Sequence, residues 1–377
     1  MSAVSADRRP LGLREKATIE RLPPRAIELG ATYLARANRA LSQPFEQSVL
    51  ATEATDHILS PLALVEDWPD PTDPLPVGDG AVHADLIDSD LDSLVRLRKV
   101  LADADHGSTG NLDAERLADQ AQTWRLPVTP YRRRDRSRVV AGLSAIAGVA
   151  DAASGTRWPR PLSDCVIVDL SALWAGPLAT SLLAADGARV VKLDPSCRPD
   201  AFGVHRHLYE HLNEGKEIID LDLRVSNDRE SFEQLVAGAD LLVDSFSRRV
   251  LPNLGYGPEQ LQALNPSLST LSIVAFPAGT PEADWISYGP GVHATSGLAE
   301  VADNSLAKRV RFQPAPIAYP DALAGLAAYA LALETLIAPT GDVESRHVEV
   351  SLLSAIAPLL ARHPDGATEN PATEAAS

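Results

Sequence analysis

One short segment, residues 165–198, constrains the fold more than any other part of this chain. Its sequence, CVIVDLSALWAGPLATSLLAADGARVVKLDPSCR, runs from an apolar stretch through a turn and a small-residue helix into a second apolar stretch. Strand, tight turn, helix and strand in this order form a βαβ unit, and ligands of such units bind at the carboxyl ends of the strands. The segment therefore predicts a parallel sheet with a ligand site at one edge.

The turn after the first predicted strand has the chemistry of an anion site. Gly176 allows the backbone to approach a ligand, and Pro177 suits the first position of a helix, where its missing N–H costs nothing. The free N–H groups and the positive end of the helix dipole favour a negative charge at this point. We expect an anionic part of a ligand to bind here.

Strand and helix signals alternate from Val166 onward with the rhythm of repeated βαβ units. The expected strands are residues 166–170, 189–193, 218–222, 241–244, 269–275 and 347–351. The expected helices include residues 177–186, 227–237, 257–264 and 321–337. The pattern predicts a doubly wound α/β domain with a parallel sheet over residues 161–361.

The first 160 residues are expected to form a smaller α/β domain and a linker. Residues 66–80 hold four prolines among acidic residues, which indicates a loop. The other expected elements are a helical region, a strand, two short helices and an extended piece, at residues 16–60, 81–87, 91–104, 112–123 and 126–130. The predicted division is a small domain at 16–131, a linker at 132–160 and disordered ends at 1–15 and 362–377.

Composition excludes several classes of partner. The net charge of −17 argues against nucleic acid, because a phosphate backbone requires a basic surface. No apolar run approaches the roughly 20 residues that span a bilayer, so we expect no membrane partner. The two cysteines, Cys165 and Cys197, show no CxxC pairing, which indicates a reducing compartment. We therefore expect a cytoplasmic protein.

Familiar cofactor and metal motifs are missing from the sequence. The chain has no GxGxxG, no P-loop and no GxSxG, which argues against NAD binding, P-loop NTPases and the usual hydrolases. His205, His207 and His211 have a spacing that partly resembles a metal site. No carboxylate or cysteine completes a known pattern around them, so we expect no metal.

The ordered residues of the first βαβ unit resemble the opening of class III CoA-transferases, the CaiB/BaiF-type family that includes formyl-CoA and carnitine CoA-transferases. The shared residues are Asp169, Ser171, Ala175, Gly176, Pro177, Gly187, Ala188, Val190, Val191, Lys192 and Asp194. The resemblance continues through LNEGK at 212–216, ADLLVDSF at 239–246 and RHVEVSLL at 346–353. It implies a Rossmann-like sheet, coenzyme A as a substrate without a further cofactor, and a homodimer of interlocked chains.

The order of the domains departs from the common family layout, in which the small domain follows the Rossmann-like region. Here the segments DGAVHADL at 79–86 and LPVTPYR at 126–132 resemble pieces of the family's small and C-terminal region. They precede the Rossmann-like region instead of following it. The resemblance therefore implies a rearranged member of the family.

Asp321 follows Tyr319 and Pro320 and begins the predicted helix DALAGLAAYALALETLIA. From the local sequence alone, a helix-capping aspartate explains it. The resemblance implies a second role, because DALAGL fits the motif that carries the family's nucleophilic aspartate, with Pro320 in place of a small residue. A carboxylate at a helix start stays ionised and oriented, so it is able to attack a thioester and form an aspartyl–acyl anhydride. We predict Asp321 as the catalytic residue.

The resemblance also implies the coenzyme A contacts, which lie in the loops after the strands. The residues at the matching positions are Ala172, Leu173, Trp174, Ala175, Lys192, Leu221, Arg224, Ser245, Phe246, Asn253 and Leu254. Ser245 replaces a frequent Asn, and Asn253 replaces a frequent Arg that would pair with phosphate. Because charge-assisted hydrogen bonds are about twice as strong as neutral ones, the second replacement weakens the expected phosphate site.

Tyr288 lies where racemases of the same superfamily place a catalytic histidine. Racemisation needs an acid and a base on opposite faces of the α-carbon, and His293 is five residues away, so this position argues against a racemase. We predict that Tyr288 lines the substrate pocket, with a simple core tyrosine as the alternative.

The function that the resemblance implies is transfer of CoA from an acyl-CoA to a carboxylic acid. Two alternatives stay open: a non-catalytic CoA-binding or interaction protein of the same family, and an acyl-CoA racemase. The rearranged order and the missing Gly-rich closing loop favour the non-catalytic protein, whereas Asp321 and the turn at Gly176 favour the enzyme. The expected partners are an acyl-CoA, a carboxylic acid and a second copy of the chain, without nucleic acid or membrane.

Overall fold

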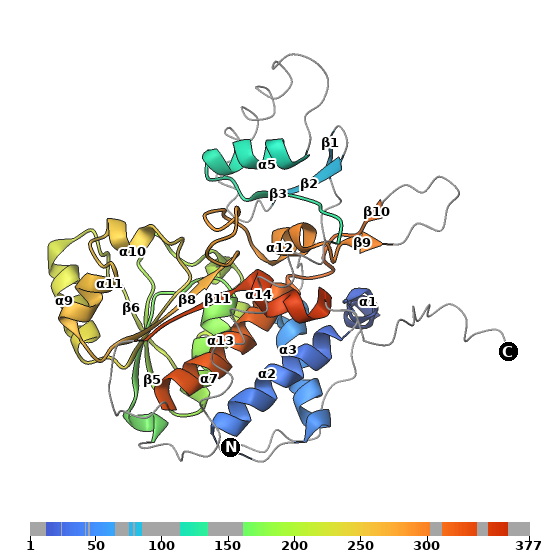
Figure 1. Ribbon diagram of the computed structural model, residues 1–377. Coiled ribbons are helices and arrows are strands. Elements are labelled where there is room, and N and C mark those ends of the chain that lie inside the picture. Colours follow the sequence, from blue (N-terminus) through green and yellow to red (C-terminus); the bar gives the residue numbers. More distant parts are fainter. Residues whose placement is uncertain are drawn as a thin grey trace, which may run out of the picture.

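The computed structural model describes residues 13–23, 25–41, 43, 46–64, 75–77, 80–84, 114–134, 161–301, 311–337 and 346–360 (Figure 1). Several predictions lie wholly or partly outside these residues. They are the helix at 91–104, most of the loop at 66–80, the end of the strand at 81–87, most of the linker at 132–160, and most of the ends expected to be disordered at 1–15 and 362–377. The expected disorder is wrong at residues 13–15, which begin a helix.

Within the described residues, six strands form one parallel sheet. They are β4 (Val166–Asp169), β5 (Arg189–Leu193), β6 (Glu217–Ile219), β7 (Leu241–Asp244), β8 (Ser269–Val274) and β11 (His347–Ser351). The strand order is β11-β8-β7-β4-β5-β6, and every neighbouring pair is parallel. The order reverses between β4 and β7, as it does in doubly wound folds. The predicted Rossmann-like parallel sheet is confirmed.

The expected strand positions hold closely, with one difference at the sheet edge. β5, β7 and β11 have the predicted bounds, and β4 and β8 end one residue early. β6 covers Glu217–Ile219 instead of 218–222 and pairs only with β5. Beyond Ile219, the carboxylate of Asp220 accepts from the Ser196 amide, and the Asp222 amide donates to Asp228. These hydrogen bonds take the place of further pairing with β5, so the strand ends at Ile219.

Helices cover both faces of the sheet (Figure 1). One face packs against α7 (Ala175–Ala185), α13 (Tyr319–Ile337) and α14 (Leu352–Ile356). In the same core, α2 (Ala26–Ala40) packs on α13 and α3 (Gln47–Leu64) packs on α2. The other face packs against α9 (Ser226–Ala237), α10 (Val250–Asn253) and α11 (Pro258–Leu264). Successive strand residues alternate between the two cores, as Ile167 and Val168 do, because β side chains have a period of two.

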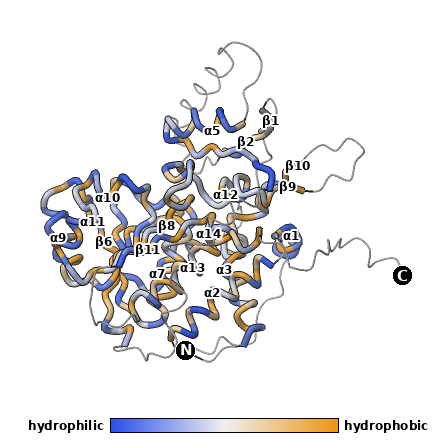
Figure 2. Tube along the Cα trace, in the orientation of Figure 1, coloured by the Kyte–Doolittle hydropathy of each residue, from blue (hydrophilic) through white to orange (hydrophobic). Residues whose placement is uncertain are grey.

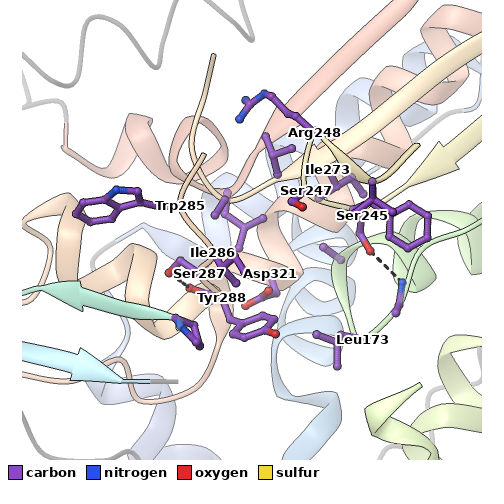
Figure 3. A pocket seen from close by; sticks show the side chains of 18 of the residues that line it. Leu173, Ser245, Ser247, Arg248, Ile273, Trp285, Ile286, Ser287, Tyr288 and Asp321 are labelled. Atoms are coloured by element: carbon purple, nitrogen blue, oxygen red, sulfur yellow. Dashed lines mark hydrogen bonds between the residues drawn. The ribbon is translucent and has the colours of Figure 1, made fainter. Parts of the chain in front are cut away.

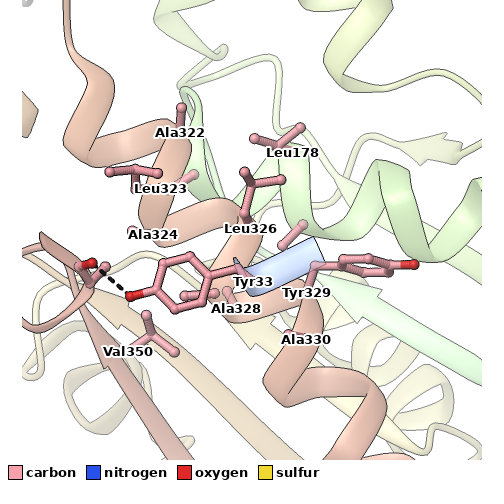
Figure 4. Close-up of a cluster of buried hydrophobic side chains, with 14 of the residues drawn as sticks. Tyr33, Leu178, Ala322, Leu323, Ala324, Leu326, Ala328, Tyr329, Ala330 and Val350 are labelled. Atoms are coloured by element: carbon pink, nitrogen blue, oxygen red, sulfur yellow. Dashed lines mark hydrogen bonds between the residues drawn. The ribbon is translucent and has the colours of Figure 1, made fainter. Parts of the chain in front are cut away.

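Helix α13 lies in the larger of the two cores. Figure 4 shows Leu326, Tyr329 and their neighbours packed against Leu178 of α7 and Tyr33 of α2. In Figure 2 the region around α7 and α13 is mainly hydrophobic, whereas α9 at the outside is mainly hydrophilic. Gly325 allows the close approach of α7 and α13, since a Cβ there would lie 2.7 Å from the Ala175 carbonyl oxygen. The packing therefore fixes α13 against the turn that opens α7.

A small unit lies beside α12 (Gly289–Ser296) (Figure 1). Its antiparallel sheet has the order β1-β2-β3, from β1 (Leu75–Val77), β2 (Gly80–Ala84) and β3 (Val128–Pro130), and it packs on α5 (Ala114–Thr123). The prediction of a loop throughout residues 66–80 is wrong at β1 and at Gly80, the first residue of β2. Pro76 has no backbone N–H to donate. It is tolerated because β1 is an edge strand that pairs only with β2, so the other side of the strand needs no hydrogen-bond donors.

The remaining described elements connect these layers. They are α1 (Leu13–Arg21), α8 (Arg206–Leu212), the short 3₁₀ turns 162–164, 201–204 and 357–360, and the antiparallel pair β9 (Glu300–Val301) and β10 (Arg311–Phe312). None of the helices in the described ranges has the length and apolar sequence needed to cross a membrane.

The hydrophobic cores group the N-terminal helices with the sheet. Residues of α2 and α3, including Tyr33 and Ile58, belong to the same core as Ile167 of β4 and Leu326 of α13. The small unit of β1–β3 and α5 has a core of its own around Leu117. The domain boundaries at 131 and 161 stay predictions.

We predict that Gly325→Ala lowers the free energy of unfolding by about 1–3 kcal/mol, because the added methyl group overpacks the contact with the Ala175 carbonyl. Gly203→Ala is the control, since a Cβ at Gly203 meets nothing within 4 Å. Denaturant titration of both variants measures the effect. Equal stability of the two variants would contradict the close packing of α7 and α13.

Candidate active site

Asp169, the last residue of β4, is fully buried and holds the turn that follows it. One carboxylate oxygen accepts hydrogen bonds from the amide and hydroxyl of Ser171, with the amide at 2.9 Å. The other accepts from Thr180 Oγ1 at 2.6 Å and from Lys216 Nζ at 3.1 Å. Lys216 also donates to the Pro177 carbonyl at 2.9 Å. These bonds join the turn, the start of α7 and the loop after α8.

Asp169 and Lys216 are both buried, and each stabilises the charge of the other. Burial acts to raise the pKa of Asp169, but Lys216, Lys192 and the hydrogen bonds from Ser171 and Thr180 hold that pKa well below its usual range. Burial lowers the pKa of Lys216 to about 8, against the attraction of Asp169. Removing one partner of such a pair leaves an uncompensated charge in the interior. The pair is therefore a strong constraint on the turn.

Lys192 and Asp200 hold the same turn from the other side. The Lys192 ammonium donates to the Ser171 carbonyl at 2.5 Å and lies 3.9 Å from an Asp200 carboxylate oxygen. That oxygen accepts a 3.0 Å hydrogen bond from the Leu173 amide. Leu173 has φ 68°, a strained conformation for a residue with a Cβ, and the bond to Asp200 holds it there. Lys192 thus lies behind the turn and supports it.

A pocket of about 370 Å³ opens at the carboxyl ends of β4, β7 and β8 (Figure 3). It lies at the point where the strand order reverses, which is the usual ligand site of doubly wound sheets. Its walls include Ala172, Leu173, Trp174, Ala175, Ser245, Phe246, Ser247, Arg248, Ile273, Trp285, Ile286, Ser287, Tyr288 and Asp321. The pocket therefore brings the predicted nucleophile together with six of the predicted coenzyme A contacts and with Tyr288.

Asp321 lies in the first turn of α13 and close to the first residue of α12. A Cβ at Gly289 would lie 1.9 Å from Asp321 Oδ2, so only glycine allows this approach. Pro290 follows in the first turn of α12, where its missing N–H has no cost. The carboxylate thus lies near the starts of two helices, whose dipoles favour a negative charge. In Figure 3 it lies between the turn residue Leu173 and the aromatic residue Trp285.

Five predicted coenzyme A contacts lie outside this pocket. Lys192 is buried behind the turn, and the others are Leu221, Arg224, Asn253 and Leu254. Arg224 is exposed and pairs with Asp222 at 2.7 Å. Leu221 and Arg224 lie in one segment and Asn253 and Leu254 in another. Arg229 joins these two segments, because it donates to the carbonyls of Leu223 at 3.2 Å and Leu254 at 2.6 Å. Phe246 connects the two groups, because it lines the pocket and packs in the same core as Leu221 and Leu254.

The small unit supplies part of the pocket wall that the sequence did not reveal. Arg125 and Pro127 line the pocket. The Gln122 side-chain amide exchanges two hydrogen bonds of 2.8 Å with the backbone of Ile286, and Arg132 pairs with Glu282 at 2.6 Å. The wall formed by residues 284–288 is therefore fixed by residues 122–132. No motif marks these residues, and only their resemblance to small-domain sequence hinted at a role.

The histidines discussed above lie away from the pocket. His293 is buried, its Nδ1 lies 2.8 Å from the Tyr319 hydroxyl, and burial lowers its pKa to about 4. It supports the start of α13, and no histidine is found among the described residues that line the pocket. His205, His207 and His211 form no metal-binding group, nor do any other three His, Cys, Asp or Glu residues in the described ranges.

We predict that Lys216→Met lowers the free energy of unfolding by about 3–5 kcal/mol, because it removes the cation that pairs with the buried Asp169 carboxylate. Arg189→Met, which breaks an exposed pair with Glu217, is the control and should cost about 1 kcal/mol or less. Urea unfolding followed by circular dichroism measures both. A loss as small as that of the control would show that the buried pair does not hold the turn.

Comparisons with known proteins cover the same region of the chain. The family model for CoA-transferase family III matches residues 162–374, more than half of the chain and all six strands of the parallel sheet. A solved CaiB/BaiF family protein from Brucella suis is 25% identical, with a TM-score of 0.47 over 53% of this chain and 55% of that one.

Two curated relatives are similar over shorter stretches. A succinyl-CoA–D-citramalate CoA-transferase of Chloroflexus aurantiacus is 32% identical over 156 residues, or 39% of each chain. A succinate–glutarate CoA-transferase of Agrobacterium fabrum is 28% identical over 215 residues, or 53% of each chain. This chain thus spans 39% and 53% of the length of these two relatives. On the strength of the family match over the sheet and its pocket, the chain belongs to CoA-transferase family III.

Proposed function

We propose that this protein transfers CoA from an acyl-CoA to a carboxylic acid, with Asp321 as the nucleophile. The observation that carries the proposal is the position of the Asp321 carboxylate. It lies in one pocket with the turn at residues 172–175, at the reversal point of the sheet. The names of the two relatives, which describe CoA transfer between carboxylic acids, support the same reaction.

The pocket has two ends on either side of Asp321, and we assign one to each part of an acyl-CoA. The thiol end of coenzyme A lies along Ala172–Ala175, Ser245 and Phe246. The Ser245 hydroxyl accepts a 3.0 Å bond from the Ala172 amide, which orders this wall. The loops at 221–224 and 253–254, joined by Arg229, receive the nucleotide. The acyl group faces Trp285 on the opposite side, with Tyr288 beside Asp321 (Figure 3).

The chemistry requires few groups. A carboxylate oxygen of Asp321 attacks the thioester carbonyl, the C–S bond breaks, and CoA leaves as a thiolate. The product is a mixed anhydride between Asp321 and the acyl group. Nucleophile and leaving group are both anions, so no proton has to move in this step, and a histidine base is not required. The starts of α12 and α13 place positive dipole ends beside the reacting oxygen.

We also propose that the protein acts as a homodimer, with the acyl-CoA and the acid as its small-molecule partners. The resemblance to a family of interlocked dimers supports this. Light scattering coupled to size exclusion should give about twice the mass of 40.1 kDa. A monomeric mass in solution would contradict the dimer.

We predict that Asp321→Asn lowers turnover of an acyl-CoA and acid pair by at least about 10³-fold, because the amide is a poor nucleophile. Calorimetry should find the affinity for CoA within about threefold of that of the unmodified protein. Asp164→Asn, which changes an exposed aspartate before β4, is the matched control and should leave turnover intact.

Retention of turnover in Asp321→Asn would contradict the mechanism. CoA binding without turnover over a broad acyl-CoA panel would instead support a non-catalytic protein of the same family, which the replacements at Ser245 and Asn253 favour. Absence of CoA binding would contradict both functions.

A further inference from the structure

Among the described residues, three arginines line the pocket, and they differ in whether a carboxylate already pairs with their guanidinium group. The Arg248 guanidinium pairs with Glu349 at 2.8 Å and donates to the Phe276 carbonyl at 2.9 Å. Arg125 and Arg198 form no ion pair with any carboxylate of the described residues. The pocket therefore offers two cations that a bound anion is able to neutralise.

The two cations come from different segments of the chain. Arg198 follows β5, in the loop that leads to Asp200 and the Leu173 amide, on the side assigned to coenzyme A. Arg125 follows α5, and its Nη1 donates to the backbone carbonyl of Asp284 at 3.0 Å. This bond places Arg125 beside the wall of residues 284–288, which faces the acyl group.

The carboxylate of Asp284 does not pair with Arg125. Asp284 turns its carboxylate to Arg249 at 3.1 Å and offers Arg125 only its backbone carbonyl. Arg125 also has φ 59°, a conformation that glycine adopts with less strain. Two of the three non-glycine residues with positive φ in the described ranges, Arg125 and Leu173, line this pocket.

We propose that Arg125 binds a second carboxylate, carried at the far end of the acyl chain, so that the protein selects dicarboxylic acids and their CoA thioesters. A guanidinium matches a carboxylate with two parallel charge-assisted hydrogen bonds. Arg125 and Asp321 line the same pocket of about 370 Å³. Arg125 is bonded to the wall of residues 284–288, to which we assign the acyl group, so the proposal places the far end of a short acyl chain held at Asp321 beside Arg125. The inference rests on the proposed function. It assigns substrate selection to a segment, residues 114–134, that lies outside the family match at 162–374.

Succinyl-CoA and butyryl-CoA test the inference, because they differ only in a terminal carboxylate or methyl group. Exchange of each thioester with its own radiolabelled acid gives kcat/KM for both. The unmodified protein should favour the succinyl pair by at least about tenfold. Arg125→Gln should lower kcat/KM for the succinyl pair by about 10–100-fold and change that for the butyryl pair by less than about threefold, and Arg125→Lys should retain part of the preference.

The controls separate a loss of carboxylate recognition from a general loss of structure or of CoA binding. Arg133→Gln removes an exposed arginine of the same segment that does not line the pocket, and it should change neither rate. Arg198→Gln should weaken both pairs equally. In a second measurement without turnover, succinate should raise the thermal midpoint of the unmodified protein more than butyrate does, and this difference should vanish in Arg125→Gln.

Equal losses for the two pairs in Arg125→Gln would overturn the inference, and so would an unmodified protein that exchanges both pairs equally. Exchange of neither pair, with no other acyl-CoA turned over, would overturn the proposed function. In that case the thermal shifts still decide the binding role of Arg125, since a difference between succinate and butyrate that Arg125→Gln removes supports it and equal shifts overturn it.

Discussion

The buried pair of Asp169 and Lys216 is the interaction on which the site depends. Asp169 is the last residue of β4, and its carboxylate accepts hydrogen bonds from Ser171, Thr180 and Lys216, which hold the backbone of the turn that follows. In the same turn, Lys192 holds the Ser171 carbonyl and Asp200 holds the Leu173 amide. A fully buried charge is tolerated only with such partners, and the cost of separating them makes the turn rigid. Coenzyme A, as we propose, binds to this prearranged surface.

Helix packing then brings the nucleophile to the turn. Gly325 lets α13 approach the Ala175 carbonyl, and Asp321 lies one helical turn earlier on the same helix. Gly289 admits the Asp321 carboxylate to the start of α12. The position of Asp321 is thus set by two close backbone contacts, and the wall opposite the turn is set by hydrogen bonds from Gln122 and Arg132. Segments about 200 residues apart in the chain build one pocket.

The sequence predicted those strands and turns that are marked by a pattern in the neighbouring residues. The apolar runs identified the strands, and the small residues around Gly176 identified the turn. The family resemblance assigned Asp321 and Tyr288, which the structure places in one pocket. Lys192 shows the limit of this reasoning, because a position at a strand end does not reveal whether a side chain points to the ligand or supports the turn from behind.

Contacts between segments that are far apart in the chain could not be predicted from the sequence. Arg125 follows a helix and reads as an ordinary surface residue, and its position beside Asp284 depends on how the small unit packs against residues 284–291. The grouping of α2 and α3 with the sheet core also escaped prediction, since an amphipathic helix does not specify which surface it covers.

Trapping of the acylated enzyme tests the central claim most directly. The protein is incubated with an acyl-CoA and hydroxylamine, digested, and its peptides are mapped by mass spectrometry. Our account predicts a hydroxamate at Asp321 and at no other carboxylate, because hydroxylamine attacks the activated aspartyl carbonyl of the anhydride. A hydroxamate at another residue, or turnover without any modification of Asp321, would contradict it.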